Sequence, residues 1–261
     1  MAATFNEEFV DVGGTKVQLL KGGSGDPLLI FHGAGGNSGW LRYVQALSDR
    51  FTVYYPSHPG FNASERPEWM ETINDMACFY SWFMEQQGLE GVRAMGFSMG
   101  GWIAAEMAVM CRHAFSKLML VDAVGVKPQD GEIADVFIIT PAQVQELAYY
   151  DPSQAPEYQQ LFGAEPTPEQ QQTAEINREM AVRLCWKPYM HDPRLPALLA
   201  SVNIPTRIVW GREDHLVPLE CGQIYHKSIP GSDLVVIDNC GHAPQVEKPE
   251  EFIQAALDFL P

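Results

Sequence analysis

The chain has 261 residues, of which 46% are hydrophobic and 19% are charged; this length and balance are typical of one globular α/β domain and exclude disordered and fibrous classes. Its formal net charge of −16 would repel phosphate backbones and anionic membranes, so we expect neither a nucleic-acid nor a membrane partner. The acidic residues are scattered along the chain, which indicates solubility and no particular substrate.

The five cysteines are an odd number without metal-ligand spacing, so we expect reduced thiols and a cytoplasmic protein. Residues 1–14 lack the basic and apolar regions of a signal peptide, and no stretch has the roughly 18 apolar residues of a membrane span. The sequence therefore predicts neither a signal peptide nor a membrane-spanning segment.

Short apolar runs bounded by Gly, Pro and Asp recur along the chain and predict buried strands. Segments with helical spacing lie between them or follow them. Such alternation predicts a mostly parallel sheet with helices on both faces and a ligand site at the carboxyl ends of the strands. The predicted strands begin at Pro27, Phe51, Val92, Leu118, Thr206 and Asp233, and the clearest helices begin near Trp102 and Pro249.

Residues 126–200 break this alternation, because they contain nine prolines and helical pieces but no convincing strand pair. A structureless loop of this length is rare in a compact domain. We therefore expect a helical cap at 126–200 over a core made of residues 1–125 and 201–261. We also expect that removing the cap changes substrate choice more than it changes the sheet.

The segment Gly96-Phe97-Ser98-Met99-Gly100 matches the pattern GxSxG between a predicted strand and a predicted helix. A nucleophile on such a tight turn stands clear of the sheet, and small residues on either side let the backbone pass itself. The pattern predicts that Ser98 is a nucleophile.

A serine hydroxyl needs a base, and the base needs an acid that orients it. His242 follows the last predicted strand, and Asp214 follows the strand that begins at Thr206, which matches the order serine, acid, histidine. Asp122 ends the preceding strand and is a rival acid, whereas we expect the neighbouring Glu213 to point elsewhere. Six other histidines compete with His242: of these, His113 and His226 are expected on the surface and His32 is better suited to shaping the turn that it precedes.

A tetrahedral intermediate requires backbone donors for its oxyanion. The glycine-rich turn that begins at His32 follows a predicted strand. It can bring the amide of Ala34 opposite the amide of Met99, so these two amides are the predicted oxyanion hole.

Four segments resemble the α/β-hydrolase superfamily in the same order: HGAGG its oxyanion turn, GFSMGG its nucleophile elbow, GREDHLVP its acid loop and NCGHAPQVEKPEEF its histidine loop. The resemblance covers essentially the whole chain. It implies an eight-stranded, mostly parallel sheet flanked by helices, with a helical cap inserted after the sixth strand. One loop differs, because many relatives have an aspartate and a PGxGxS turn where this chain has Ser57-His58-Pro59-Gly60 and ends in Ser64.

The resemblance also bears on the reaction. The serine nucleophile disfavours the dehalogenase and epoxide-hydrolase branches, and the chain is similar to bacterial carboxylesterases and to hydrolases that cleave carbon–carbon bonds of ring-fission products. We expect hydrolysis of a small carboxylic ester through an acyl-enzyme. Carbon–carbon hydrolysis stays open, since Arg178, Arg183 and Arg194 could bind a substrate carboxylate. A cofactor-free perhydrolase and a ligand receptor of the same fold are further alternatives.

Aromatic side chains could line an apolar substrate pocket, although core packing explains each of them as well. Beyond the three proposed catalytic residues, no cluster of His, Cys and carboxylates has metal-ligand spacing, so we expect no metal and no organic cofactor. The pocket candidates are Trp40, Trp102, Phe137 and Trp186.

Overall fold

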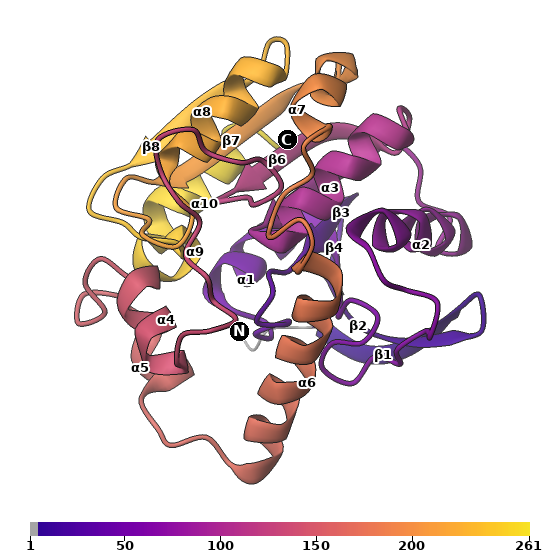
Figure 1. The fold of residues 1–261 in the computed structure, drawn as a ribbon. Coiled ribbons are helices and arrows are strands. Elements are labelled where there is room, and N and C mark those ends of the chain that lie inside the picture. Colours follow the sequence, from indigo (N-terminus) through magenta and orange to yellow (C-terminus); the bar gives the residue numbers. More distant parts are fainter. Residues whose placement is uncertain (1–4) are drawn as a thin grey trace.

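The computed structural model describes residues 5–261 (Figure 1). Residues 1–4 lie outside the described part. They belong to the segment 1–14 in which the sequence predicts no signal peptide. None of the helices in the described part is both long enough and apolar enough to cross a membrane.

An eight-stranded sheet lies at the centre of the molecule, in the order β1-β2-β4-β3-β5-β6-β7-β8 (Figure 1). The pairs β1–β2 and β2–β4 are antiparallel, and the other five pairs are parallel. This sheet confirms the fold class that the sequence predicted. Its strands are β1 Phe5–Val12, β2 Thr15–Gly23, β3 Asp26–Phe31, β4 Phe51–Pro56, β5 Val92–Phe97, β6 Phe115–Val121, β7 Thr206–Gly211 and β8 Asp233–Ile237.

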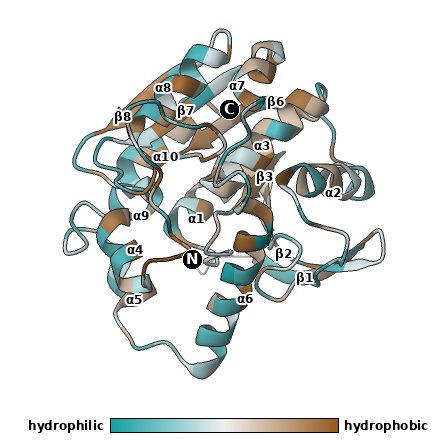
Figure 2. Ribbon diagram, viewed as in Figure 1, coloured by the Kyte–Doolittle hydropathy of each residue, from teal (hydrophilic) through white to brown (hydrophobic). Residues whose placement is uncertain are grey.

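Helices cover both faces of the sheet (Figure 1). The helices α2, α3 and α8 lie on one face, whereas α1 and α10 pack against each other on the opposite face. Figure 2 shows hydrophobic residues concentrated on the strands and on α3, which is buried over most of its length. The helices of this part are α1 Arg42–Ser48, α2 Ile73–Gln86, α3 Met99–Met110, α8 Leu219–Ser228, α9 Pro244–Glu247 and α10 Pro249–Leu257.

Residues 126–200, called here the insert, lie between β6 and β7 and contain helices but no strand of the described sheet. Two of the helices start at a Thr-Pro pair, where Thr140 and Thr167 accept a hydrogen bond from the backbone of the third helical residue. Figure 2 shows that α6 is mostly hydrophilic, and its buried residues begin only at Asn177. The helices of the insert are α4 Pro141–Ala148, α5 Tyr158–Phe162, α6 Pro168–Cys185 and α7 Leu195–Leu198.

Candidate active site

Ser98 lies at the turn between β5 and α3 with φ of 51° and ψ of −116°. These angles are strained for a residue with a side chain and occur mostly at functional sites. Hydrogen bonds hold the turn, since Ser98 N donates to Val121 O of β6 and Ser98 O accepts from three backbone amides. Ser98 itself is partly exposed although the residues on either side of it are buried.

The glycines of this turn are required by close contacts. A Cβ atom on Gly96 would lie 2.5 Å from Gly100 O, and one on Gly100 would lie 2.3 Å from Phe31 O. A Cβ on Gly101 would lie 2.5 Å from the Ala123 side chain. Backbone atoms cannot move away as a flexible side chain can, so a larger residue at Gly96 or Gly100 would displace the serine.

The glycine-rich turn after β3 faces Ser98. A Cβ atom on Gly33 would lie 3.3 Å from the Cβ of Ser98, and Gly36 N closes the turn by donating to Gly33 O. Within residues 5–261, the amides of Ala34 and Met99 donate to no other group of the protein. Both amides are therefore available to a ligand.

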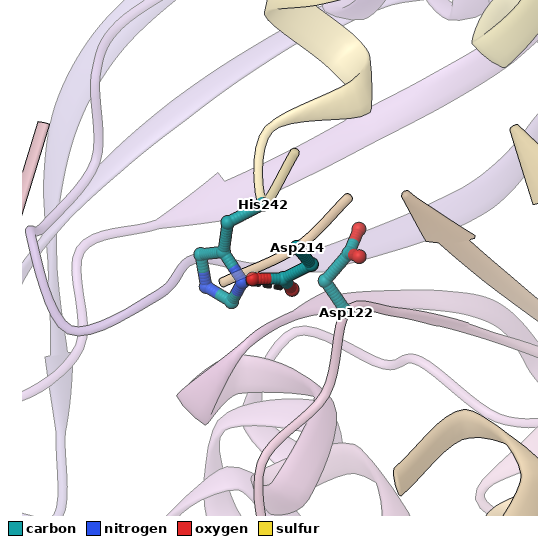
Figure 3. Close-up of side chains that lie close together, drawn as sticks. All are labelled: Asp122, Asp214 and His242. Atoms are coloured by element: carbon teal, nitrogen blue, oxygen red, sulfur yellow. Dashed lines mark hydrogen bonds and ion pairs between the residues drawn. The ribbon is translucent and has the colours of Figure 1, made fainter. Parts of the chain in front are cut away.

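His242 follows β8, and Asp214 follows β7. The Nδ1 of His242 lies 2.6 Å from Oδ2 of Asp214, as Figure 3 shows. The other carboxylate oxygen of Asp214 accepts from the amides of Leu216 and Val217. These bonds orient the carboxylate, assign a proton to Nδ1 and leave Nε2 as the basic atom of a neutral ring.

Ser98 Oγ makes no hydrogen bond within the described residues. A bond between a nucleophile and its base often tightens only when substrate binds. The elbow follows β5, whereas Asp214 and His242 follow β7 and β8, and these parallel strands all end at the same edge of the sheet with β6 between β5 and β7.

Asp122, the rival acid, lies beyond Asp214 as seen from the imidazole ring (Figure 3). It is 1% exposed, and its Oδ1 accepts from Gly211 N, whereas its Oδ2 has no partner among the described residues. Burial, and next the negative charge of Asp214, raise the pKa of Asp122 well above its ordinary value. Both effects favour the neutral form of this carboxyl group.

Asp122, Asp214 and His242 offer ligand atoms within 4.8 Å of one another. The bond between His242 and Asp214 and the bonds of both aspartates to backbone amides already use most of these atoms, so the set fits a hydrogen-bonded arrangement better than a metal site. The neighbouring Glu213 points elsewhere, as expected, because its Oε2 accepts from Cys240 N.

His58 and His32 form a buried pair beneath the glycine-rich turn. His32 donates from Nδ1 to Gly33 O and accepts at Nε2 from His58 N. His58 donates from Nε2 to His32 O and accepts at Nδ1 from the Tyr80 hydroxyl. The Nε2 of His32 faces an N–H donor, so the bonds of His32 require a neutral ring. Burial lowers the pKa of His32 to about 3 and that of His58 well below its usual value.

This pair predicts a pH-dependent stability. A histidine whose pKa is lowered by folding stabilises the protein fully above the unfolded value near 6.5, and that contribution is lost as the pH falls. We expect His58→Ala to lower the free energy of unfolding by about 2–4 kcal/mol at pH 8, and the difference from the parent protein to shrink toward pH 5. Urea denaturation of both proteins at pH 8, 7, 6 and 5 measures this difference in the free energy of unfolding. A difference that grows as the pH falls would contradict a neutral histidine pair.

The four pocket candidates lie in different surroundings. Trp40 stacks on Phe5 with 4.7 Å between ring centroids, and Phe137 packs edge-on against Tyr189. Trp102 is buried in α3 and donates to Glu106, whereas Trp186 is 57% exposed at the end of α6. The structure brings none of these four into a common described pocket, so their role stays a prediction.

Glu247 is a site residue that the sequence did not reveal. Its Oε2 accepts from Gly241 N next to His242, and its Oε1 accepts from the amides of Tyr150 and Asp151 in the insert. His242 N donates to Ala148 O of the insert as well. In the sequence, Glu247 is only a glutamate five residues after His242. Its role becomes visible only in the structure, where the insert contacts the loop of His242.

Comparisons with known proteins agree with this geometry. The family model described as "alpha/beta hydrolase fold" matches residues 26–249. A 2-hydroxy-6-oxononadienedioate/2-hydroxy-6-oxononatrienedioate hydrolase of Pseudomonas putida is 28% identical, over 92% of this chain and 89% of its own length.

Two solved structures are similar over nearly the whole chain. A bacterial membrane phospholipase A superposes with a TM-score of 0.81 at 25% identity, covering 98% of this chain and 86% of the other. A carboxylesterase from Bacillus subtilis superposes with a TM-score of 0.75 at 20% identity, covering 99% and 92%. The latter likeness shows the fold alone.

Proposed function

The chain belongs to the α/β-hydrolase family, and on that basis we propose that it is a serine hydrolase that cleaves a carboxylic ester. The observation that carries the proposal is the 2.6 Å contact between His242 and Asp214 at the strand edge where the strained turn presents Ser98. A partly exposed serine, a ring with a free Nε2 and an oriented carboxylate are the parts that acyl transfer needs.

In the proposed reaction, Nε2 of His242 takes the proton of the Ser98 hydroxyl as the oxygen attacks the ester carbonyl. The alcohol leaves with that proton, and an acyl-enzyme remains on Ser98. Water then repeats the attack, with His242 again as base, and releases the acid. Asp214 holds the ring in the tautomer with its proton on Nδ1 and stabilises the imidazolium that forms.

The amides of Ala34 and Met99 are the proposed oxyanion donors. They lie on the two turns that meet at Ser98, and neither is used by another group of the described chain. Donors fixed in place before the reaction stabilise the developing charge without reorganisation, which makes them a large part of catalysis.

The insert is the proposed cap. Its contacts with the loop of His242, through Ala148 and Glu247, support a position beside the reacting groups. They also refine the expected result of removing it: the amide of His242 would lose its acceptor, so deletion would impair the reaction as well as substrate choice.

Carbon–carbon hydrolysis is a second candidate, favoured by the name of the Pseudomonas putida relative. The contacts of the insert arginines favour the ester reaction. Arg183 donates to the carbonyls of Glu68 and Met70, and Arg194 pairs with Asp192. Arg178 donates to Phe137 O. Each of these arginines would have to break a bond within the protein before it could bind a substrate carboxylate.

A substrate panel tests the proposal. Nitrophenyl esters of increasing acyl length, one phospholipid and one ring-fission dienoate are measured with the parent protein and with Ser98→Ala. We expect turnover of short activated esters that depends on Ser98. Faster turnover of the dienoate than of every ester would select the second candidate, brominating activity with peroxide and acetate would indicate a perhydrolase, and binding without turnover would indicate a receptor.

A further inference from the structure

Asn177 of α6 is a buried polar residue that the proposed reaction does not use. It is 3% exposed, and both ends of its side-chain amide contact loops of the core. Its Oδ1 accepts from Asn62 N at 2.7 Å, and its Nδ2 donates to Gly35 O at 2.9 Å. Because a backbone amide can only donate, the bond from Asn62 determines which end of the side chain faces Gly35.

The bond to Gly35 continues through the glycine-rich turn. Gly35 O and Gly36 N belong to one peptide group, and Gly36 N donates to Gly33 O. Gly33 O and Ala34 N belong to the next such group. Because the N–H and C=O of a trans peptide point in opposite directions, the chain of bonds runs from Asn177 through two peptide groups and ends on the Ala34 N–H.

Close packing supports the same arrangement. A Cβ atom on Gly36, whose φ is 94°, would lie 2.2 Å from Nδ2 of Asn177 and 2.5 Å from Oδ1 of Asn62. Asn62 has a φ of 52°, which asparagine tolerates better than most residues, and its side chain bonds both backbone groups of Asn37. Two asparagine side chains therefore cover the turn.

The helix that carries Asn177 has other contacts with the core. Arg183 donates to the carbonyls of Glu68 and Met70, and Arg66 pairs with Glu179. We expect α6 to stay in place when the side chain of Asn177 is shortened, so the effect of that side chain on the turn can be measured separately.

We propose that Asn177 is a positioning residue, which orients and polarises the Ala34 amide as an oxyanion donor through the peptide groups of the glycine-rich turn. This inference rests on the proposed function. Aligned hydrogen bonds strengthen one another, so a donor at the start of the chain makes the last N–H a better donor. The insert would then contribute directly to the oxyanion hole.

The test compares Asn177→Ala with the parent protein and with Gln172→Ala, which changes an exposed residue of the same helix. Active sites are counted by the nitrophenol burst. We expect kcat per titrated site to fall by about 10- to 100-fold in Asn177→Ala, with KM changed less than about threefold and the pH midpoint of kcat/KM unchanged. Affinity for a trifluoromethyl ketone, which mimics the tetrahedral intermediate, should fall by the same factor as kcat/KM.

A second variant isolates the donor. Asn177→Asp keeps the shape and the acceptor for Asn62 N, but a carboxylate cannot donate to Gly35 O. We expect it to be at least as impaired as Asn177→Ala at pH 8. Full kcat per titrated site in either variant, or a loss explained by fewer titrated sites, would show a merely structural residue and overturn the proposal.

Hydrogen exchange of the peptide covering residues 33–37 gives a readout independent of turnover. We expect faster exchange in Asn177→Ala than in the parent protein or Gln172→Ala. If the parent protein hydrolyses no ester, the proposed function fails, whereas the exchange data still test the hydrogen-bond chain on which the inference rests, since unchanged protection of this turn would overturn it.

Discussion

Replacing Ser98 by alanine should abolish ester hydrolysis and covalent labelling by a fluorophosphonate together. In comparable triads, removal of the nucleophile lowers turnover by about 10⁶-fold, because water must then attack without covalent catalysis. The fold should persist, since the bonds that hold this turn are made by the backbone of Ser98. Turnover of one activated ester and mass spectrometry of the labelled protein measure the effect.

Ser81→Ala is the matched control for this prediction. Ser81 lies in α2, where its hydroxyl donates to Cys78 O, so its loss should leave labelling and turnover unchanged. Labelling that persists in Ser98→Ala, or turnover above a tenth of the parent value, would refute the assignment of the nucleophile.

Replacing Asp214 by asparagine should lower turnover by about 10⁴-fold, whereas Asp122→Asn should change it only a few-fold. An amide at position 214 can present its NH₂ to the ring and so favour the wrong tautomer of His242. At position 122 the amide resembles the neutral acid that burial already favours, and its oxygen can still accept from Gly211 N. Turnover of one activated ester by both variants, after circular dichroism confirms folding, measures the two effects.

Asp122→Asn has a second signature in stability. A carboxyl group whose pKa is raised by folding binds more protons in the folded state, so its contribution falls as the pH rises above the ordinary carboxyl range near 4. The variant lacks this contribution, so its free energy of unfolding should rise relative to that of the parent protein between pH 5 and 8.

The turnover comparison has a contradicting outcome. A large loss of turnover in Asp122→Asn with little change in Asp214→Asn would move the acid to Asp122.

Six of the eight strands and the clearest helices were predictable because each is encoded locally. The predicted strands correspond to β3–β8, and β6 begins earlier than expected, at Phe115. The pair β1 and β2 was not predicted from the residues, because β1 is almost wholly exposed and lacks a buried apolar run. A glycine pair with φ of 58° and 84° connects these two strands, which is the turn that a tight hairpin requires.

The sequence by itself determined the parts of the site whose geometry depends on neighbours in the chain. The turn at Ser98 is one of them, since Gly96 and Gly100 permit a contact that only glycine allows. The helical character of the insert is another, since Thr-Pro pairs and prolines restrict the backbone where they stand.

Only the tertiary structure decided which distant groups meet. It places Asp214, and not Asp122, within hydrogen-bond distance of His242, pairs His58 with His32, and brings Asn177 to Gly35 across 142 positions of the chain. Such contacts depend on how parallel strands and the helices between them align in space. Periodicity and propensity describe the local backbone, whereas the orientation of a buried side chain follows from the hydrogen-bond partners that packing offers it.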